Sequence, residues 1–100
     1  MKTIEQFVVA HSAWAVRKFP DQTTEGICKH IEKELIEVRA CNGKDLVEWI
    51  DVIMLALDGY GRNGGTPEAL LPLLDFKLNK NIDRVWAVQT DPNQPVEHIE

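Results

Sequence analysis

The chain is 100 residues long, with a formal net charge of -5 and an isoelectric point near 5.1. Dispersed cations on an acidic chain argue against a nucleic-acid-binding surface, because neutralising phosphates requires a basic face. The longest apolar run, residues 52–57, is too short to cross a bilayer, so no membrane partner is expected. Cys28 and Cys41 form no CxxC pair, and no signal sequence is recognisable, which predicts a reduced cytoplasmic setting.

Apolar residues at three-four spacing predict a first helix over residues 4–19, which ends before Pro20. Its apolar stripe consists of Ile4, Phe7, Val8, His11, Trp14, Ala15 and Phe19. The loop DQTT that follows ends in two candidate N-caps, Thr23 and Thr24, and Glu25 suits the positive end of the next helix dipole. A second helix is therefore predicted to run to about Ala40.

The segment CNGK, residues 41–44, predicts a tight helical hairpin with Asn-Gly as the breaker. Asp45 is a candidate cap for a third helix, which is expected to end near Leu57 because GYGRNGG follows it. Thr66 and Pro67 are expected to open a fourth helical segment, which Pro72 splits or kinks before LLDFKLNKNIDRVW. The tail TDPNQPVEHIE has two prolines and no periodicity, so it is expected to be extended.

These elements predict an all-α protein, a helical bundle of about four helices completed by dimerisation. We expect residues 1–89 to form one helical domain and residues 90–100 to form an extended C-terminal tail. A chain of this length buries only about 60–65% of its unfolded surface. Because the third helix is apolar nearly all round, the sequence predicts at least a homodimer.

Four acidic side chains are predicted to converge from the second and third helices. At about 100° per residue, Glu34 and Glu37 share one side of the second helix. Glu48 and Asp51 share one edge of the third, and the short hairpin brings the two pairs opposite each other. Carboxylates crowded in a low-dielectric groove bind cations or have raised pKa values. Oxygen ligands without a nearby cysteine suit hard divalent ions, Mg²⁺ or Mn²⁺.

Roles besides a magnesium or manganese site stay open for these acids. A single Glu-x-x-Glu pair on a helix is most often a solvated surface feature. A di-iron site requires Glu-x-x-His on two helices, and none of the three histidines, His11, His30 and His98, has a glutamate three residues before it. Asp58 lies on the same edge of the third helix, either as a group that supports the ligands or as an ordinary C-terminal helix residue.

The strings HIEKELIEV, DLVEWIDVIMLALDG, KLNKNIDRVW and PVEHI resemble the MazG-like all-α nucleoside triphosphate pyrophosphohydrolases. Within that superfamily the chain is most similar to the dATP/dGTP diphosphohydrolase branch, with its MazZ-type phage and bacterial enzymes. The resemblance covers roughly residues 25–99. Ten residues separate Glu37 from Glu48, fewer than in many MazG-like proteins but suited to this branch. The N-terminal HSAWAVRKFP is similar only loosely.

The resemblance implies hydrolysis of a purine deoxynucleoside triphosphate, dGTP or dATP, to the monophosphate and pyrophosphate. It implies metal-ligand roles for Glu34, Glu37, Glu48 and Asp51, and phosphate-contacting roles for Lys77, Asn81 and Arg84. Either Glu34 or Glu37 would accept the proton of the attacking water. His30 and Lys33 lie in the matched string, and Lys33 either reaches a phosphate or pairs with neighbouring acids.

A purine requires an apolar or aromatic wall with a few hydrogen-bonding groups. The candidates are Trp14, Phe19, His11 and Trp86. For Trp14 and Trp86, core packing competes with base stacking.

Members of the family form dimers or dimers of dimers, which implies an active site lined partly by the neighbouring subunit. Two alternatives to the purine enzyme stay open. The same fold can act on a pyrimidine such as dUTP or dCTP, or on a phosphoribosylated nucleotide. The chain can also be a catalytically silent helical dimerisation or regulatory module.

Overall fold

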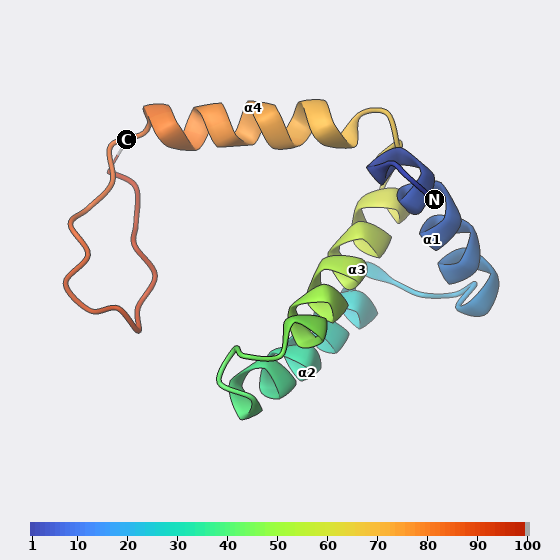
Figure 1. Cartoon of the computed structure of the whole chain (residues 1–100), viewed down its shortest axis with the longest axis horizontal. Helices are drawn as coiled ribbons and strands as arrows, with labels where there is room; N and C mark the ends of the chain where they lie inside the picture. Colours follow the sequence, from blue (N-terminus) through green and yellow to red (C-terminus); the bar gives the residue numbers. More distant parts are fainter. Residues whose placement is uncertain (100) are drawn as a thin grey trace. The chain divides into compact units, whose positions relative to one another are not determined.

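The computed structural model describes residues 1–99, which form four helices (Figure 1). They are α1 (Ile4–Lys18), α2 (Thr24–Ala40), α3 (Leu46–Arg62) and α4 (Leu70–Asp83). Extended pairing in residues 1–99 is confined to an isolated antiparallel bridge between Trp86 and His98, so the all-α prediction is confirmed. None of the described helices is long and apolar enough to cross a bilayer. Residues 1–68 form one compact unit and the described residues from 69 onward form a second.

Side-chain caps begin the first three helices. The Thr3 hydroxyl accepts a hydrogen bond from the backbone N–H of Gln6 at 3.1 Å, and the Gln6 side chain accepts one from Thr3, which makes a capping box for α1. Thr23 caps α2 through Gly26, as the sequence predicts. Asp45 caps α3, also as predicted, because its Oδ1 accepts from the backbone N–H of Val47 at 3.0 Å.

The connection between α2 and α3 is a tight turn. Asn42 and Gly43 have φ angles of 55° and 71°, in the left-handed region that asparagine and glycine tolerate best. The indole N–H of Trp49 donates to the carbonyl oxygen of Gly43 at 3.0 Å, which ties the turn to the first turn of α3. The predicted helical hairpin is therefore confirmed, and it fixes the two acidic segments side by side.

The predicted end of α3 near Leu57 is wrong, because the helix continues to Arg62 through two glycines. Each glycine costs about 1 kcal/mol relative to alanine in a helix, and here each lies close to a neighbouring helix. A Cβ atom on Gly59 would lie 3.8 Å from Ile27 of α2, and one on Gly61 would lie 3.5 Å from Ser12 of α1. Tertiary packing thus extends the helix beyond the point where local propensity would end it.

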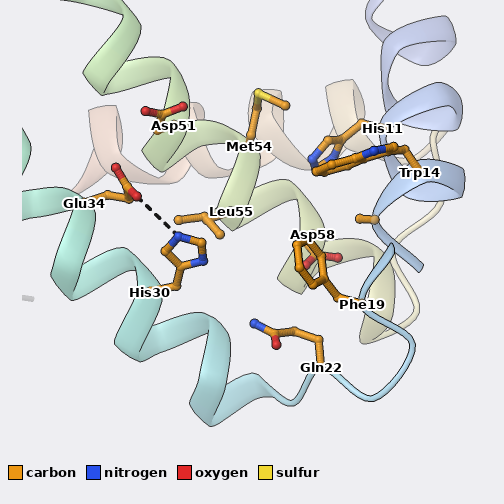
Figure 2. Close-up of a pocket in the computed structure, with 11 residues that line it drawn as sticks. His11, Trp14, Phe19, Gln22, His30, Glu34, Asp51, Met54, Leu55 and Asp58 are labelled. Atoms are coloured by element: carbon orange, nitrogen blue, oxygen red, sulfur yellow. Dashed lines mark ion pairs between the residues drawn. The ribbon is translucent and has the colours of Figure 1, made fainter. Parts of the chain in front are cut away.

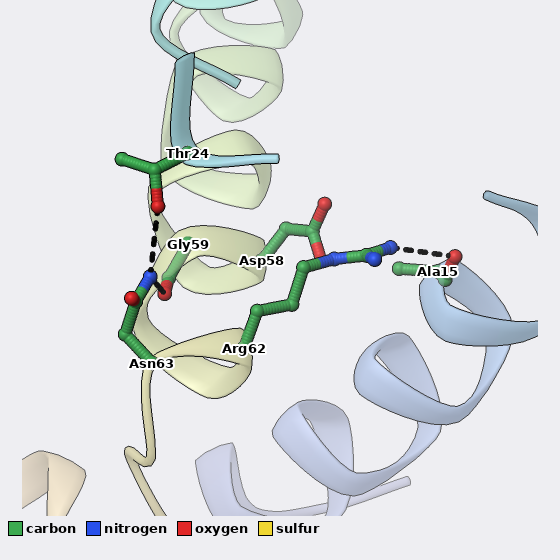
Figure 3. Close-up of polar contacts among 6 residues, drawn as sticks. All are labelled: Ala15, Thr24, Asp58, Gly59, Arg62 and Asn63. Carbon is green, nitrogen blue, oxygen red and sulfur yellow. Dashed lines mark hydrogen bonds and ion pairs between the residues drawn. The ribbon is translucent and has the colours of Figure 1, made fainter. Parts of the chain in front are cut away.

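Polar contacts at the end of α3 tie it to both neighbouring helices (Figure 3). The Arg62 guanidinium donates to the carbonyl oxygen of Ala15 in α1 at 2.9 Å. The Asn63 amide donates to the Thr24 hydroxyl at the start of α2 at 3.3 Å. The first unit is therefore a three-helix assembly in which α3 packs against both α1 and α2.

The core of this unit is small. Its buried apolar residues are Val8 and Ala15, which lie on the predicted stripe of the first helix, and Ile27 and Val38 of α2. The apolar surface of α3 contributes little to this core, because Leu46, Ile50 and Ile53 are 75%, 47% and 52% exposed in the single chain. A substantial apolar surface of α3 is thus left without a partner within residues 1–99.

The second unit consists of α4 and the tail. Here α4 begins at Leu70 after Ala69, so the predicted start at Thr66 and Pro67 is wrong. Pro72 is the third residue of α4, where its missing N–H costs no helical hydrogen bond, and the predicted split or kink does not occur. The tail is extended, as predicted, and doubles back so that the N–H of Ala87 donates to the carbonyl of Glu97. Its last residue, Glu100, lies outside the described residues, and the predicted domain boundary at residue 89 stays a prediction.

Candidate metal centre and adjoining pocket

Three carboxylates from the hairpin form one cluster. Glu34 of α2 and Glu48 and Asp51 of α3 each offer an oxygen, and these oxygens lie within 4.8 Å of one another. All three side chains are half-buried. Glu48 and Asp51 are three residues apart, so they share one edge of α3, which faces Glu34 across the hairpin.

Glu37, the fourth predicted ligand, does not belong to this cluster. It is exposed on α2, one turn nearer the hairpin than Glu34. Its charge still acts on the cluster, because it is one of the groups that raise the pKa of Glu48. Partial desolvation is the largest cause of that raised pKa, followed by repulsion from nearby carboxylates, those of Asp51, Asp45, Glu37 and Glu34.

The donor set fits a hard divalent cation. Carboxylate oxygens are the ligands that Mg²⁺ and Mn²⁺ prefer, and the cluster contains neither sulfur nor imidazole. Cys28 is exposed, and the thiol of Cys41 donates to the carbonyl of Val38, so neither thiol supplies a competing soft ligand. The raised pKa of Glu48 also fits, since a bound cation relieves the repulsion that causes it.

Two further residues of α2 differ in their contact with the cluster. Nε2 of His30 lies 3.3 Å from Oε1 of Glu34, so His30 contacts a carboxylate of the cluster directly. Lys33 is exposed and forms no ion pair among residues 1–99, which leaves its amine available to a ligand.

A pocket of about 300 Å³ adjoins the cluster (Figure 2). Glu34, Asp51 and His30 lie along one side, and the pocket extends from them between the three helices of the first unit. Its other lining residues are His11, Trp14, Ala15, Phe19, Gln22, Met54, Leu55 and Asp58. Five of these eleven lining residues are apolar and six are polar or charged, and small-molecule sites likewise combine an apolar wall with polar groups that orient the ligand.

Three of the four aromatic candidates line this pocket. The Trp14 and Phe19 rings meet edge to face with their centroids 5.9 Å apart. The centroid of the His11 ring lies 6.2 Å from that of Trp14. Trp14 and Phe19 are each 45% exposed, so they form a wall of the pocket and are not sealed in the core. His11 is buried beside Trp14.

Sequence reasoning missed Gln22, whose side chain also lines the pocket. It stands in the loop between α1 and α2, directly before the N-cap Thr23. Its place directly before a helix N-cap is the one signal that could have indicated it. The loop fixes the position of such a residue, so an analysis of helical periodicity does not detect it. Met54 and Leu55 also line the pocket, but in the sequence they are only two of the many apolar residues of the third helix.

The predicted phosphate-contacting residues lie in the second unit. Lys77 is exposed on α4. The Arg84 guanidinium donates to the side-chain oxygen of Asn81 at 3.3 Å, and the indole N–H of Trp86 donates to the backbone carbonyl of Asn81 at 2.8 Å. Trp86 also meets His98 edge to face. Asn81, Arg84 and Trp86 thus form one connected group, and their roles toward a ligand stay predictions.

The chain is similar to known proteins along its whole length. The sequence profile of a family described as dATP/dGTP pyrophosphohydrolase matches residues 7–100. The structure of a MazG-like pyrophosphohydrolase from cyanophage S-2L, bound to dGDP and three catalytic Mn²⁺ ions per active site, is similar with a TM-score of 0.78. That similarity covers 100% of both chains at 27% sequence identity. No curated protein matches the chain. The predicted resemblance to the MazG-like pyrophosphohydrolases is confirmed.

Proposed function

This chain belongs to the dATP/dGTP pyrophosphohydrolase family, and on that premise we propose that it hydrolyses dGTP and dATP to the monophosphate and pyrophosphate with Mg²⁺ or Mn²⁺. It is a nucleotide pyrophosphohydrolase with the MazG-like fold. The single observation that carries the proposal is the placement of three convergent carboxylates at one side of a pocket with an aromatic wall.

The chemistry of the pocket suits a triphosphate. A divalent cation bound by the carboxylate cluster would supply positive charge to the phosphates and to an attacking water. Glu48 and Asp51 of α3 and Glu34 of α2 would hold that cation. Water attacks the α phosphorus, the bond from that phosphorus to the bridging oxygen breaks, and pyrophosphate leaves. The proton of the water passes to a carboxylate, for which Glu34 and Glu37 are the two candidates.

The proposal keeps the phosphate-contacting roles that the family resemblance implies for residues of the second unit. Lys77 and Arg84 would clamp the leaving pyrophosphate, and Asn81, which accepts from Arg84, would hold the guanidinium in position. Lys33, exposed and without an ion pair in the described chain, is a further candidate for a phosphate contact.

The cyanophage enzyme supports the choice of metal and nucleotide. It binds dGDP, a purine deoxynucleotide, together with three catalytic Mn²⁺ ions in each active site. The described cluster in this chain offers three carboxylates, and Glu37 is close enough to influence Glu48 electrostatically. We therefore include Glu37 among the proposed ligands, as a group that joins the cluster when cations bind.

A homodimer, or a dimer of dimers, is part of the proposal. Leu46, Ile50 and Ile53 lie on one face of α3 and are exposed in the single chain. Covering such a face with a second copy of α3 would enlarge a core that is small in one chain. We also place the enzyme in the cytoplasm of a bacterium or of a phage host, where nucleoside triphosphates are present.

Product analysis tests the function directly. The protein would be incubated with Mg²⁺ and, separately, with each common deoxynucleoside and ribonucleoside triphosphate, and the products resolved by anion-exchange chromatography. Formation of dGMP or dAMP with pyrophosphate, stopped by EDTA, is the expected result. Consumption of dUTP or dCTP in their place would move the assignment to the pyrimidine alternative. If a folded sample consumes no triphosphate, the chain is the silent helical module.

A further inference from the structure

The side of the pocket away from the carboxylate cluster has its own polar groups. Asp58 and Gln22 lie there beside Phe19, whereas Glu34 and Asp51 lie at the other side (Figure 2). Asp51 and Asp58 are two turns apart on α3, roughly 10 Å along the axis at the usual helical rise. A nucleotide spans a separation of this kind between its α-phosphate and the Watson–Crick edge of its base.

Asp58 has one carboxylate oxygen engaged and one free. Its side chain is only 9% exposed, and Oδ1 accepts from Nε of Arg62 at 2.6 Å. Arg62 is itself held by the carbonyl of Ala15, so the carboxylate is fixed in orientation. The second oxygen, Oδ2, has no hydrogen-bond partner among residues 1–99 and points away from Arg62 (Figure 3). It is not sealed in the protein interior, and Asp58 is one of the residues that line the pocket.

Gln22 offers the complementary groups. Its side chain is half-buried against the first turn of α2, where a Cβ atom on Gly26 would lie 3.5 Å from its amide nitrogen. No hydrogen bond engages this amide within the described chain, although it faces the pocket. It can therefore donate and accept toward a ligand, whereas an ionised Asp58 can only accept.

We infer that Asp58 and Gln22 bind the Watson–Crick edge of the base and make the enzyme prefer guanine to adenine, an inference that rests on the proposed function. Guanine presents two adjacent donors, N1–H and the N2 amino group, which one carboxylate oxygen or both can accept. Its O6 is an acceptor that suits the amide N–H of Gln22. Adenine presents an acceptor at N1, which a carboxylate repels, and it has no amino group at position 2. The Trp14 and Phe19 wall stacks on either purine and does not discriminate between them.

The unmodified protein provides the first test, through kcat/KM for a series of base analogues. Replacing dGTP by dITP removes only the N2 amino group, and kcat/KM is expected to fall about tenfold, the effect of one lost hydrogen bond to a charged group. The control is 7-deaza-dGTP, which changes only the opposite edge of the base and should be hydrolysed like dGTP. Equal values for dGTP and dITP would overturn the inference.

Two variants provide the second test. In Asp58→Asn the Oδ1 acceptor for Arg62 is retained while the second oxygen, Oδ2, is exchanged for an amide donor. The ratio of kcat/KM for dGTP to that for dATP should then fall at least tenfold. Gln22→Ala should reduce kcat/KM for dGTP more than for dATP. Glu25→Gln, which removes one exposed charge from the first turn of α2, should leave the ratio unchanged.

The possible outcomes separate the two proposals. A fall in both activities by the same factor in Asp58→Asn would assign Asp58 a structural role only and overturn the inference, while the proposed function would stand. Absence of triphosphate hydrolysis in the unmodified protein would overturn both. If Asp58→Asn does not fold, the dGTP and dITP comparison decides the question alone.

Discussion

Nε2 of His30 lies 3.3 Å from Oε1 of Glu34, one turn along α2, so a residue that lines the pocket also orients a carboxylate of the metal cluster. Partners of this kind commonly change metal affinity by about 10- to 100-fold when removed. We expect His30→Ala to weaken Mn²⁺ binding by such a factor, measured by isothermal titration calorimetry. Lys29→Ala, which alters the exposed neighbouring residue, is the control. Equal Mn²⁺ affinity in both variants would show that the contact does not orient Glu34.

Glu48→Gln should separate activity from stability. The amide keeps the size of the side chain but removes a ligand charge, so activity should fall at least about a hundredfold. Without metal, the variant should have a higher Tm than the unmodified protein, because the repulsion that raises the Glu48 pKa is gone. Added Mg²⁺ should raise the Tm of this variant less than it raises the Tm of the unmodified protein.

The matched control for Glu48→Gln is Glu32→Gln, which changes an exposed acid on α2. Thermal unfolding with and without Mg²⁺ would be compared across the three proteins. A Glu48→Gln protein with lower Tm than the unmodified chain, in EDTA, would contradict the electrostatic account of this site.

The raised pKa of Glu48 predicts how the site depends on pH. Burial and the neighbouring carboxylates make the folded protein hold this proton more tightly than the unfolded chain does. As pH rises from the unfolded pKa of Glu48 through its higher folded pKa, Glu48 ionises and lowers the free energy of unfolding of the metal-free protein. At acid pH, where Glu48 is protonated in both states, this destabilisation is absent. Metal binding displaces the proton, so affinity should fall as pH drops through the raised pKa.

Proton release provides the measurement for this pH dependence. Calorimetry of Mg²⁺ binding in buffers of different ionisation enthalpy should show protons released under mildly acidic conditions and fewer at neutral pH. Binding that releases no proton at any pH would show that Glu48 is not a ligand.

The basic residues of α4 and its C-terminal end should act on the triphosphate. Lys77→Met and Arg84→Met should each lower kcat/KM for dGTP about tenfold or more, because each removes a charge-assisted hydrogen bond to phosphate. Lys80→Met is the matched control, since Lys80 is an exposed lysine of the same helix outside the proposed phosphate set. Equal losses in all three variants would indicate a general electrostatic effect and not a specific contact.

The exposed face of α3 should be covered by a second chain. We expect multi-angle light scattering to report a dimer or tetramer, and Ile53→Glu to shift it toward monomer by placing a charge in an apolar interface. Val9→Glu, at a position 56% exposed on α1, should leave the oligomer intact. A monomeric unmodified protein with full activity would refute this part of the proposal.

Local sequence signals predicted those parts of the fold in which local chemistry decides the structure. Thr23 and Asp45 cap their helices as expected, and Asn42 and Gly43 form the expected turn. The end of α3 was missed because its glycines allow close approach to Ile27 and Ser12, which lie far away in sequence. The start of α4 was missed because the Thr66 and Pro67 signature describes a helix start that the backbone does not adopt.

The carboxylate cluster was predictable for a similar reason. Helical periodicity and a short hairpin are enough to bring Glu34, Glu48 and Asp51 together. Periodicity predicts which face of a helix a side chain occupies, but not how close that side chain comes to the facing helix. It therefore could not separate Glu37 from the other three carboxylates. The pocket needs α1 and the Gln22 loop in addition, whose placement depends on packing against α3.

All the ligands of the proposed metal cluster come from one continuous segment, Glu34–Asp51, which folds on itself at a turn of a few residues. Bringing its two halves together requires closure of only a short loop, so the entropic cost is low and the contacts are of low contact order. The hairpin can therefore form early in folding, before α1 arrives. A cation present at that stage would link the acidic segments as the helices pair, and so act on the rate of folding as well as on the finished enzyme.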